Sequence, residues 1–402
     1  MEEPKNIVII GAGYGGITAA LRLAHLFRTT AGYRILLIDR NPYHTLKTQL
    51  HEAAVHKSEV TIDVGRIIRK QAITFQLGAV TTLDLVRRIV EVGGVHIRYE
   101  YLVLAIGSQA NFYNIPGLEE NALPLQSASD AQKIYDRISV LCAAAAAETD
   151  RVKRKEMLRF VIGGGGLSGI EMAGELVDHV VSSAINYGLP PGEPEVMIVE
   201  GADDILPASA PHLRDSTRLK LLSKGVSVLT RTRVVGVSAE EVILSTGERV
   251  RCKTLVWTGG IRVSEIARES GFAIGESGRI LVNEYLQSVT SPNVYAIGDN
   301  ALAINPATKK PVPAAAQFAL QQGRLVAENL FAAATGKLQM PYLPKVWGEV
   351  ISLGRHLAVG WIALPGIRKL KFVGFLASLV KTAIKEKHII LLRKESRSWI
   401  RY

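Results

Sequence analysis

The amino-acid sequence predicts an α/β fold made of two copies of one lobe, followed by a basic C-terminal region. Two stretches carry this prediction: IVIIGAGYGGITAALRLA at 7–24 and VIGGGGLSGIEMAGEL at 161–176. Each contains a buried strand, a turn with spaced glycines and the beginning of a helix. The chain has 402 residues, which is longer than a usual single domain and favours two or three lobes.

The first glycine turn has the spacing G-x-G-x-x-G at Gly11, Gly13 and Gly16. Gly11 permits a tight turn, Gly13 lets a diphosphate approach the backbone, and Gly16 lets the helix pack closely on the strand. The next strand, RILLID, ends in Asp39, whose carboxylate can bind both hydroxyls of an adenosine ribose. This order predicts a Rossmann-like dinucleotide site. A tight turn without a ligand is the alternative.

The second glycine turn repeats the spacing at Gly164, Gly166 and Gly169, and its second strand, EVMIVE, ends in Glu200. A Pro- and Gly-rich loop at 186–195 accounts for the longer gap before this acid. A carboxylate here suits a free 2′-hydroxyl and repels a 2′-phosphate. The second lobe is therefore expected to bind NADH rather than NADPH.

A weaker repeat follows each glycine turn. Residues 97–107 and 250–260 share an Arg, a Leu-Val pair and a closing glycine at matching offsets. We expect a strand in each, ending in small residues that let the backbone approach a cofactor. Two such lobes imply two dinucleotides, and a nicotinamide beside a flavin would allow direct hydride transfer.

The composition indicates in which cellular compartment the protein is expected. The 48% hydrophobic content allows a substantial core, yet no run reaches the roughly 18 apolar residues of a spanning helix. The acidic start MEEPKN does not resemble a secretory signal. The only cysteines, Cys142 and Cys252, are far apart, which indicates a reducing cytoplasm and argues against a dithiol active site.

With TSPNVYAIGDNA at 290–301, these motifs resemble the two-dinucleotide-binding-domain flavoproteins, whose fold is glutathione-reductase-like. GGGLSGIEMAGEL and AAAQFALQQG are most similar to the type II NADH:quinone oxidoreductases within that group. The resemblance extends from residue 5 to about residue 365. It implies three regions: an FAD-binding domain (1–115 and 278–338), an NADH-binding domain (116–277) and a membrane-associating region (339–402).

The resemblance also implies which residues hold the cofactors FAD and NADH. The implied FAD residues are Gly11, Gly13, Gly15, Gly16, Asp39, Arg40, Lys47, Val80, Ala105, Gly107, Asp299, Ala316 and Gln317. The implied NADH residues are Gly164, Gly166, Gly169, Glu171, Glu200 and Gly259. No metal site is expected.

Three residues are implied to take part in catalysis. Gln317 and Gln321, one helical turn apart, would lie near the quinone, and Gln317 could donate an N–H to a quinone oxygen. A polar helix face is the alternative for both. Glu171 would order a proton path or the cofactor, although the helix dipole also favours an acid in this position.

The implied activity is hydride transfer from NADH to FAD, followed by two-electron reduction of a membrane quinone without proton pumping. Sulfide:quinone reductases and disulphide reductases need redox cysteines that this chain lacks. Two alternatives stay open: a related flavin reductase with another acceptor, and a slow-turnover NADH-binding flavoprotein of the death-effector type. The second alternative would contact nucleic acid, which the apolar residues of the tail argue against.

The C-terminal region carries most of the positive charge. Residues 340–402 contain twelve Lys or Arg against three Glu, a net +9 of the chain's +11, which leaves +2 for the rest. Apolar residues follow helical spacing at positions 372, 375, 376, 379, 380, 383 and 384.

These residues predict an amphipathic helix over 371–392, too short to span a bilayer, with Lys381 and Lys385 on the face opposite Phe372. We expect residues 366–402 to bind an anionic membrane surface at its cytoplasmic face. HIILLRK is interpreted as a returning strand. A helix packed on the protein's own core or on a homodimer partner is the alternative.

Overall fold

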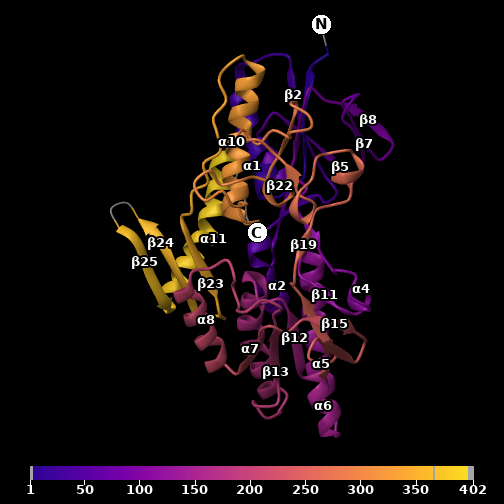
Figure 1. The fold of residues 1–402 in the computed structure, drawn as a ribbon, viewed down its shortest axis with the longest axis vertical. Helices are drawn as coiled ribbons and strands as arrows, with labels where there is room; N and C mark the ends of the chain where they lie inside the picture. The colour runs from indigo at the N-terminus through magenta and orange to yellow at the C-terminus, as the bar shows by residue number, and fades with distance from the viewer. Residues whose placement is uncertain (1–2, 365–366, 397–402) are drawn as a thin grey trace.

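The computed structural model describes residues 3–364 and 367–396, and Figure 1 shows two lobes stacked along the long axis. The upper lobe is built on a five-stranded parallel sheet with the order β21-β9-β1-β2-β5. These strands are β21 (Val294–Ala296), β9 (Tyr101–Leu104), β1 (Lys5–Ile10), β2 (Tyr33–Asp39) and β5 (Ile73–Leu77). The central strand β1 is an apolar run whose Ile7, Val8 and Ile9 are fully buried, as expected for a strand covered on both faces.

Two helices from opposite ends of the sequence pack together in this lobe. Helix α1 (Tyr14–Leu26) follows the first glycine turn, and α10 (Ala316–Ala334) lies against it. A Cβ atom on Gly323 would come within 2.3 Å of the carbonyl oxygen of Gly15, so this helix crossing requires glycine at position 323. The lobe is thus completed by residues far from its beginning.

The lower lobe repeats the same sheet, with the order β11-β18-β12-β13-β14. These parallel strands are β11 (Leu123–Pro124), β18 (Thr254–Trp257), β12 (Arg159–Gly163), β13 (Glu195–Val199) and β14 (Val226–Leu229). Helices α5 (Ala128–Ala147), α7 (Leu167–Asn186) and α8 (Pro211–Ser223) pack around it. The predicted strands, helices and the loop at 186–195 are confirmed in both lobes.

Short strands and helices outside the two five-stranded sheets complete the fold. Strands β10 (Gln109–Ala110) and β19 (Ile261–Arg262) pair antiparallel where the chain passes between the lobes. The remaining elements are β3 (Tyr43–Thr45), α2 (Leu50–His56), β4 (Thr61–Asp63), α3 (Val64–Ile68), β6 (Val80–Asp84), β7 (Ile89–Val92), β8 (Val95–Arg98), α4 (Leu118–Asn121), α6 (Arg151–Met157), β15 (Val234–Val237), β16 (Glu241–Leu244), β17 (Arg249–Arg251), α9 (Ile266–Glu269), β20 (Ile280–Leu281) and β22 (Ala301–Leu302).

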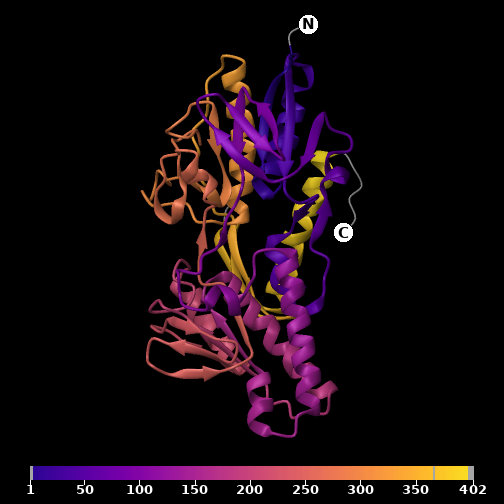
Figure 2. The same cartoon turned by 90° about the vertical axis from the view of Figure 1, so that its right-hand side faces the viewer.

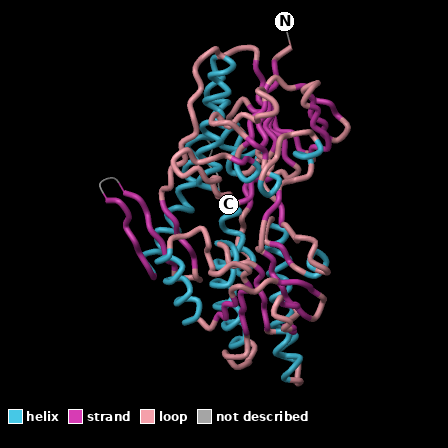
Figure 3. Tube along the Cα trace, viewed as in Figure 1, coloured by secondary structure: helices cyan, strands magenta, loops and turns pink. Residues whose placement is uncertain are grey.

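The C-terminal region is an antiparallel sheet followed by one helix. The sheet contains β23 (Gly348–Ser352), β24 (Ala358–Leu364) and β25 (Ile367–Gly374). The hairpin of β24 and β25 projects from the body of the molecule (Figures 1 and 3). Helix α11 (Phe375–Ser396) then runs from the junction of the lobes along the upper lobe, in yellow in Figure 2.

The prediction of a helix over 371–392 is wrong at both ends. Residues 371–374 belong to β25, and HIILLRK is helical rather than a strand. The helix also packs on the protein: Ala377, Ile389 and Leu392 are buried. Periodicity identified an amphipathic segment, but it could not show that folded protein covers one face. The predicted side-chain positions of Phe375, Leu376, Ile384 and Lys385 lie outside the described residues.

Candidate active site

The two glycine turns have nearly the same backbone geometry. The φ angle is 105° at Gly11 and 107° at Gly164, a conformation that side chains other than glycine rarely adopt. A Cβ on Gly11 would lie 2.2 Å from the carbonyl oxygen of Ala105, and one on Gly164 would lie 2.7 Å from the Cα of Gly259. The structure therefore brings Ala105 and Gly259 against the turns, as the weaker repeat predicts.

The third glycine of each turn closes the helix onto the turn. A Cβ on Gly16 would lie 1.8 Å from the oxygen of Gly11, and a Cβ on Gly169 would lie 1.9 Å from the oxygen of Gly164. The middle glycines differ, because a Cβ on Gly13 or Gly166 would meet no heavy atom within 4 Å. These two residues are the N-caps of α1 and α7. Open space therefore faces two helix N-termini, which suits a diphosphate.

The two acids that the sequence predicts to bind ribose make matching hydrogen bonds. Asp39 accepts the backbone N–H of Ala12 at 2.6 Å and that of Asn41 at 2.7 Å, on different oxygens. Glu200 accepts the N–H of Gly165 at 2.5 Å and that of Ala202 at 2.7 Å, again on different oxygens. A carboxylate has about four acceptor positions. Each oxygen thus keeps a position for a ribose hydroxyl, so both lobes fit a dinucleotide.

Polar residues expected near the flavin gather beside the first turn. Asp299 accepts the hydroxyl of Ser108 at 2.8 Å, and the N–H of Gly107 donates to Asn300 at 3.2 Å. Lys47 is exposed, yet desolvation by the surrounding protein lowers its pKa, while the charge of Asp299 acts in the opposite direction.

The other implied flavin residues lie at the ends of elements. Arg40 is exposed directly after Asp39, and Val80 begins β6. Ala316 begins α10. Gly15 packs against α10, with its Cβ position 3.1 Å from Ile297.

The two glutamines of α10 bind the backbone of the segment before β23. Gln321 donates to the oxygen of Lys345 at 2.9 Å and accepts the N–H of the same residue at 2.9 Å. Gln317 makes longer bonds, 3.5 Å to the oxygen of Gly348 and 3.4 Å from the N–H of Trp347. Bonds beyond about 3.2 Å are weak. The amide of Gln317 is therefore much less restrained than that of Gln321.

Glu171 lies in a buried charge cluster between the lobes. Its Oε1 is 3.2 Å from Nζ of Lys381 on α11, and its Oε2 is 3.6 Å from Nδ1 of His51 on α2. Lys381 also donates to Nε2 of His51 at 2.8 Å. Burial would raise the pKa of Glu171, but the charge of Lys381, with contributions from His51 and from the N–H of Ser352, outweighs it and holds that pKa below its usual range. The prediction of Lys381 on an outward basic face is wrong.

A second carboxylate extends this cluster toward solvent. Glu175 binds Nε2 of His56 at 3.0 Å and accepts the hydroxyl of Ser352 at 3.2 Å. The N–H of Ser352 in turn donates to Glu171 at 3.1 Å. The bond to Glu175 raises the pKa of His56, whose side chain is 38% exposed. The contacts thus connect a surface histidine to the buried Glu171.

Sequence reasoning missed most partners of Glu171. His51 and Ser352 come from α2 and β23, and Lys381 comes from α11. His51 lies in the segment PYHTLKTQLHEAA at 42–54, shortly after Asp39 and close to the implied flavin residue Lys47, and this closeness in the sequence is the signal that could have identified it. The others come from segments distant in the sequence, and their proximity is set by tertiary packing.

The cysteines do not contribute to the site. Cys142 and Cys252 are both buried and form no disulfide. Burial raises the pKa of each thiol to about 11. Because the thiolate is the reactive form, these residues are inert.

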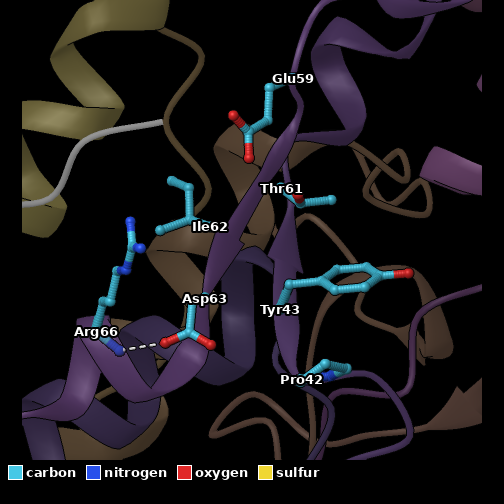
Figure 4. Close-up of a pocket in the computed structure, with 7 residues that line it drawn as sticks. All are labelled: Pro42, Tyr43, Glu59, Thr61, Ile62, Asp63 and Arg66. Carbon is cyan, nitrogen blue, oxygen red and sulfur yellow. Dashed lines mark hydrogen bonds between the residues drawn. The ribbon is translucent and has the colours of Figure 1, made fainter.

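A small open pocket of about 200 Å³ lies beside the upper lobe, on β3, β4 and α3 (Figure 4). In it Asp63 accepts the backbone N–H of Arg66 at 2.7 Å. No residue of a glycine turn lines the pocket, so it is separate from the candidate cofactor sites. The lining residues are Pro42, Tyr43, Glu59, Thr61, Ile62, Asp63 and Arg66.

Comparison with known proteins agrees with this geometry. A family model described as pyridine nucleotide-disulphide oxidoreductase matches residues 5–323. A type II NADH:quinone oxidoreductase from Staphylococcus aureus is 28% identical over 367 residues, which cover 90% of each chain.

Two solved structures share the fold over nearly the whole chain. A structure of NDH2 from Plasmodium falciparum in complex with NADH has a TM-score of 0.85 and 20% identity, and covers 98% of this chain and 96% of that one. The sulfide:quinone oxidoreductase from Aquifex aeolicus has a TM-score of 0.78 and 21% identity, with 97% and 92% covered. The glycine turns described above thus belong to a fold that is found in both proteins.

Proposed function

The chain belongs to the pyridine nucleotide-disulphide oxidoreductase family, and from this premise we propose that it is a type II NADH:quinone oxidoreductase. It holds FAD in the upper lobe and NADH in the lower lobe. When bound, FAD accepts a hydride from NADH and passes two electrons on to a quinone. The buried cysteines exclude the disulphide chemistry of the family name, because neither thiol is reactive or has a partner.

The matching hydrogen bonds of the two glycine turns carry this proposal. In each lobe an acid accepts the N–H of the residue after the first glycine, at 2.6 Å from Asp39 and at 2.5 Å from Glu200. Each acid keeps acceptor positions for a ribose, and each helix N-terminus faces open space. Two complete dinucleotide sites in one chain are what a flavoprotein reduced by NADH requires. The carboxylate of Glu200 favours NADH over NADPH.

The residues of this chain bind and orient the two nucleotides. Gly13 and Gly166 leave room for the diphosphates at the helix N-termini. Asp299, held by Ser108, and Lys47 lie at the flavin side of the upper lobe. Because the surrounding protein lowers the pKa of Lys47, its ammonium group loses its proton more readily than that of a fully hydrated lysine.

We assign different roles to the two glutamines. Gln317 is the candidate donor to a quinone oxygen, because its long bonds leave the amide free to turn toward another acceptor. Gln321 is a positioning residue that holds the backbone of Lys345 by two bonds of 2.9 Å. The segment before β23 is thereby fixed next to Gln317.

Glu171 orders the proton supply in this proposal. Glu175 accepts the hydroxyl of Ser352, and Glu171 accepts the backbone N–H of the same residue, so the contacts that begin at His56 orient Glu171 and do not themselves carry a proton to it. Quinol formation takes up two protons, and His56 can hold one at Nε2 because its pKa is raised. Lys381 keeps Glu171 ionised until a proton arrives.

We also propose that the protein binds the cytoplasmic face of an anionic membrane through the hairpin of β24 and β25. Leu370 is 45% exposed and Val373 is 50% exposed. Lys369 lies over the ring of Trp361 at 4.3 Å. Apolar side chains beside lysines suit a lipid interface. None of the helices within 3–364 and 367–396 has the length and apolar character needed to cross a bilayer.

Anaerobic stopped-flow spectroscopy tests the activity directly. The purified protein should be yellow, should bleach when NADH is added, and should recover its colour when a short-chain quinone is added. Recovery with ferricyanide but not with quinone would favour a related reductase with another acceptor. A colourless protein that takes up no flavin would contradict the proposal.

A further inference from the structure

The carbonyl oxygens inside the two glycine turns have different partners, although the turns are otherwise alike. In the second turn the oxygen of Gly165 accepts the backbone N–H of Leu206 at 2.8 Å. In the first turn the equivalent oxygen, that of Ala12, is 2.8 Å from Nδ1 of His44. A backbone amide does not titrate, whereas an imidazole does so near neutral pH. Only in the first turn, therefore, does the partner of this carbonyl oxygen have a protonation state that can change near neutral pH.

The bond from His44 to the oxygen of Ala12 sets the direction of the backbone N–H of Gly13. In a planar trans peptide the C=O of Ala12 and the N–H of Gly13 point in opposite directions. Fixing the oxygen of Ala12 therefore aims the N–H of Gly13, the N-cap of α1, away from His44. The N–H of Ala12 is held by Asp39. Asp39 therefore restrains the peptide before Ala12 and His44 the peptide after it, next to the space where a diphosphate would lie.

His44 is in turn held by the C-terminal helix. Its Nε2 lies 3.3 Å from Nε2 of His388 on α11. A carbonyl oxygen only accepts, so Nδ1 of neutral His44 carries the proton and its Nε2 is an acceptor. His388 must then be the donor. The ring of Tyr14 contacts both imidazoles, with centroid distances of 5.1 Å and 4.7 Å.

We propose that His388 and His44 form a relay that couples docking of α11 to retention of FAD by the first glycine turn, and that the relay holds only while His44 is neutral. This inference rests on the proposed function, in which the first turn binds FAD. Both histidines are positioning residues, because they act on the flavin through the peptide of Ala12.

Among the described residues, the titratable groups that face each histidine are Tyr14 of α1, Asp39 of β2 and the other histidine of the pair. Burial lowers the pKa of His44, against the opposing effects of its bond to Ala12 and of Asp39. Burial, with a contribution from His44, lowers the pKa of His388 to about 3. Both rings are therefore neutral at pH 7 in the docked helix.

The sign of the pH dependence follows from these directions. A histidine released from the contact regains its ordinary pKa of 6.5. Below this pH the released form binds protons that the docked form does not, so docking weakens as the pH falls. A proton on Nε2 of His44 would also place its N–H opposite the N–H on Nε2 of His388, so that the two donors would repel each other.

The experiment measures FAD release from the full-length, FAD-loaded protein, using the fluorescence of free flavin after dilution. His388→Phe keeps a ring against Tyr14 but removes the N–H donor. His388→Gln keeps an N–H close to the position of Nε2. His96→Phe is the matched control, because the side chain of His96 is 68% exposed on β8.

At pH 7.5 we expect FAD release to be about 2- to 5-fold faster in His388→Phe, the lower part of the range for one hydrogen bond, because the contact is long at 3.3 Å. His388→Gln should restore most of the retention, and His96→Phe should behave like the wild type. NADH affinity should not change, because Leu206 holds the second turn. Wild-type release should accelerate between pH 7.5 and pH 5.5, and His388→Gln should show a weaker acceleration.

An FAD release rate that is the same in the wild type and in His388→Phe would overturn the relay. If His388→Gln releases FAD as fast as His388→Phe does, only side-chain packing matters, and the relay is overturned as well. If His388→Phe does not fold, the pH dependence decides, and an identical dependence in the wild type and His388→Gln overturns the inference. A wild-type protein that binds no FAD overturns the proposed function itself.

Discussion

The buried ammonium group of Lys381 allows a quantitative test of the interlobe cluster. At 3.2 Å from Glu171, with an effective dielectric constant of about 20, the attraction is about 5 kcal/mol before desolvation is counted. Both side chains are largely buried, at 18% and 14% exposure. Removing one partner of such a pair typically costs about 3 to 5 kcal/mol. We expect Lys381→Met to lower the free energy of unfolding by about 3 kcal/mol or more at pH 7.5.

The pH dependence of the destabilisation by Lys381→Met follows from the ionisation of Glu171. The pKa of Glu171 lies below its ordinary value of 4.5, so its ionised form stabilises the fold above pH 4.5. This contribution is lost as the pH falls through the folded pKa. The difference between the wild type and Lys381→Met should therefore be largest at neutral pH and should shrink below pH 4.5.

Urea unfolding of the FAD-loaded protein at pH 7.5 and pH 4 measures both effects. Lys381→Arg should retain most of the stability because it keeps the charge. Lys394→Met is the matched control on the same helix, where an exposed lysine should matter by no more than about 0.5 kcal/mol. In a Glu171→Gln background Lys381→Met should cost less. Additive losses, or a Lys381→Met variant as stable as the wild type, would refute the reasoning.

Three further predictions concern cofactor choice, quinone reduction and membrane binding. Glu200→Gln should raise the ratio of NADPH to NADH oxidation by at least about tenfold, because a like-charge contact is removed; an unchanged ratio would show that this acid does not face the ribose. Gln317→Ala should slow reoxidation by quinone roughly tenfold or more while NADH still reduces the flavin, and equal losses in stopped flow would remove its role as a donor. Gln321→Ala should instead lower thermal stability and affect both steps. Leu370→Glu should reduce flotation with anionic liposomes and leave ferricyanide reduction intact; full retention on liposomes would contradict the proposed hairpin contact.

Local patterns predicted the nucleotide sites because their constraints are local. The positive φ angles at positions 11 and 164 favour glycine, and this local requirement is visible in the sequence as the regular spacing of the glycines. Asp39 ends β2 and Glu200 directly follows β13, and each of these strands pairs with the strand before its glycine turn, so chain order alone places the acids at the turns. The partners of these acids are backbone N–H groups, which any sequence supplies.

The C-terminal region could not be predicted in the same way. Helical spacing predicted Lys381 on the face opposite an apolar stripe, but spacing does not show what each face of a helix contacts. In the structure that lysine meets carboxylates of two lobes rather than water. Phe372 was assigned to the helix, yet it pairs with Gly360 in the hairpin, because strand pairing overrides local helical spacing.

The upper lobe is built from two segments of the chain, one before and one after the lower lobe, and this order affects folding during synthesis. Strand β21 and helix α10 complete this lobe, and both follow the whole of the lower lobe in the chain. Proteins are synthesised from the N-terminus, and domains generally fold as units as they emerge from the ribosome. Here the lower lobe can be finished first, while the N-terminal strands wait for residues up to 334 to be translated. Any chaperone that accompanies this chain during translation would therefore protect its oldest segment longest.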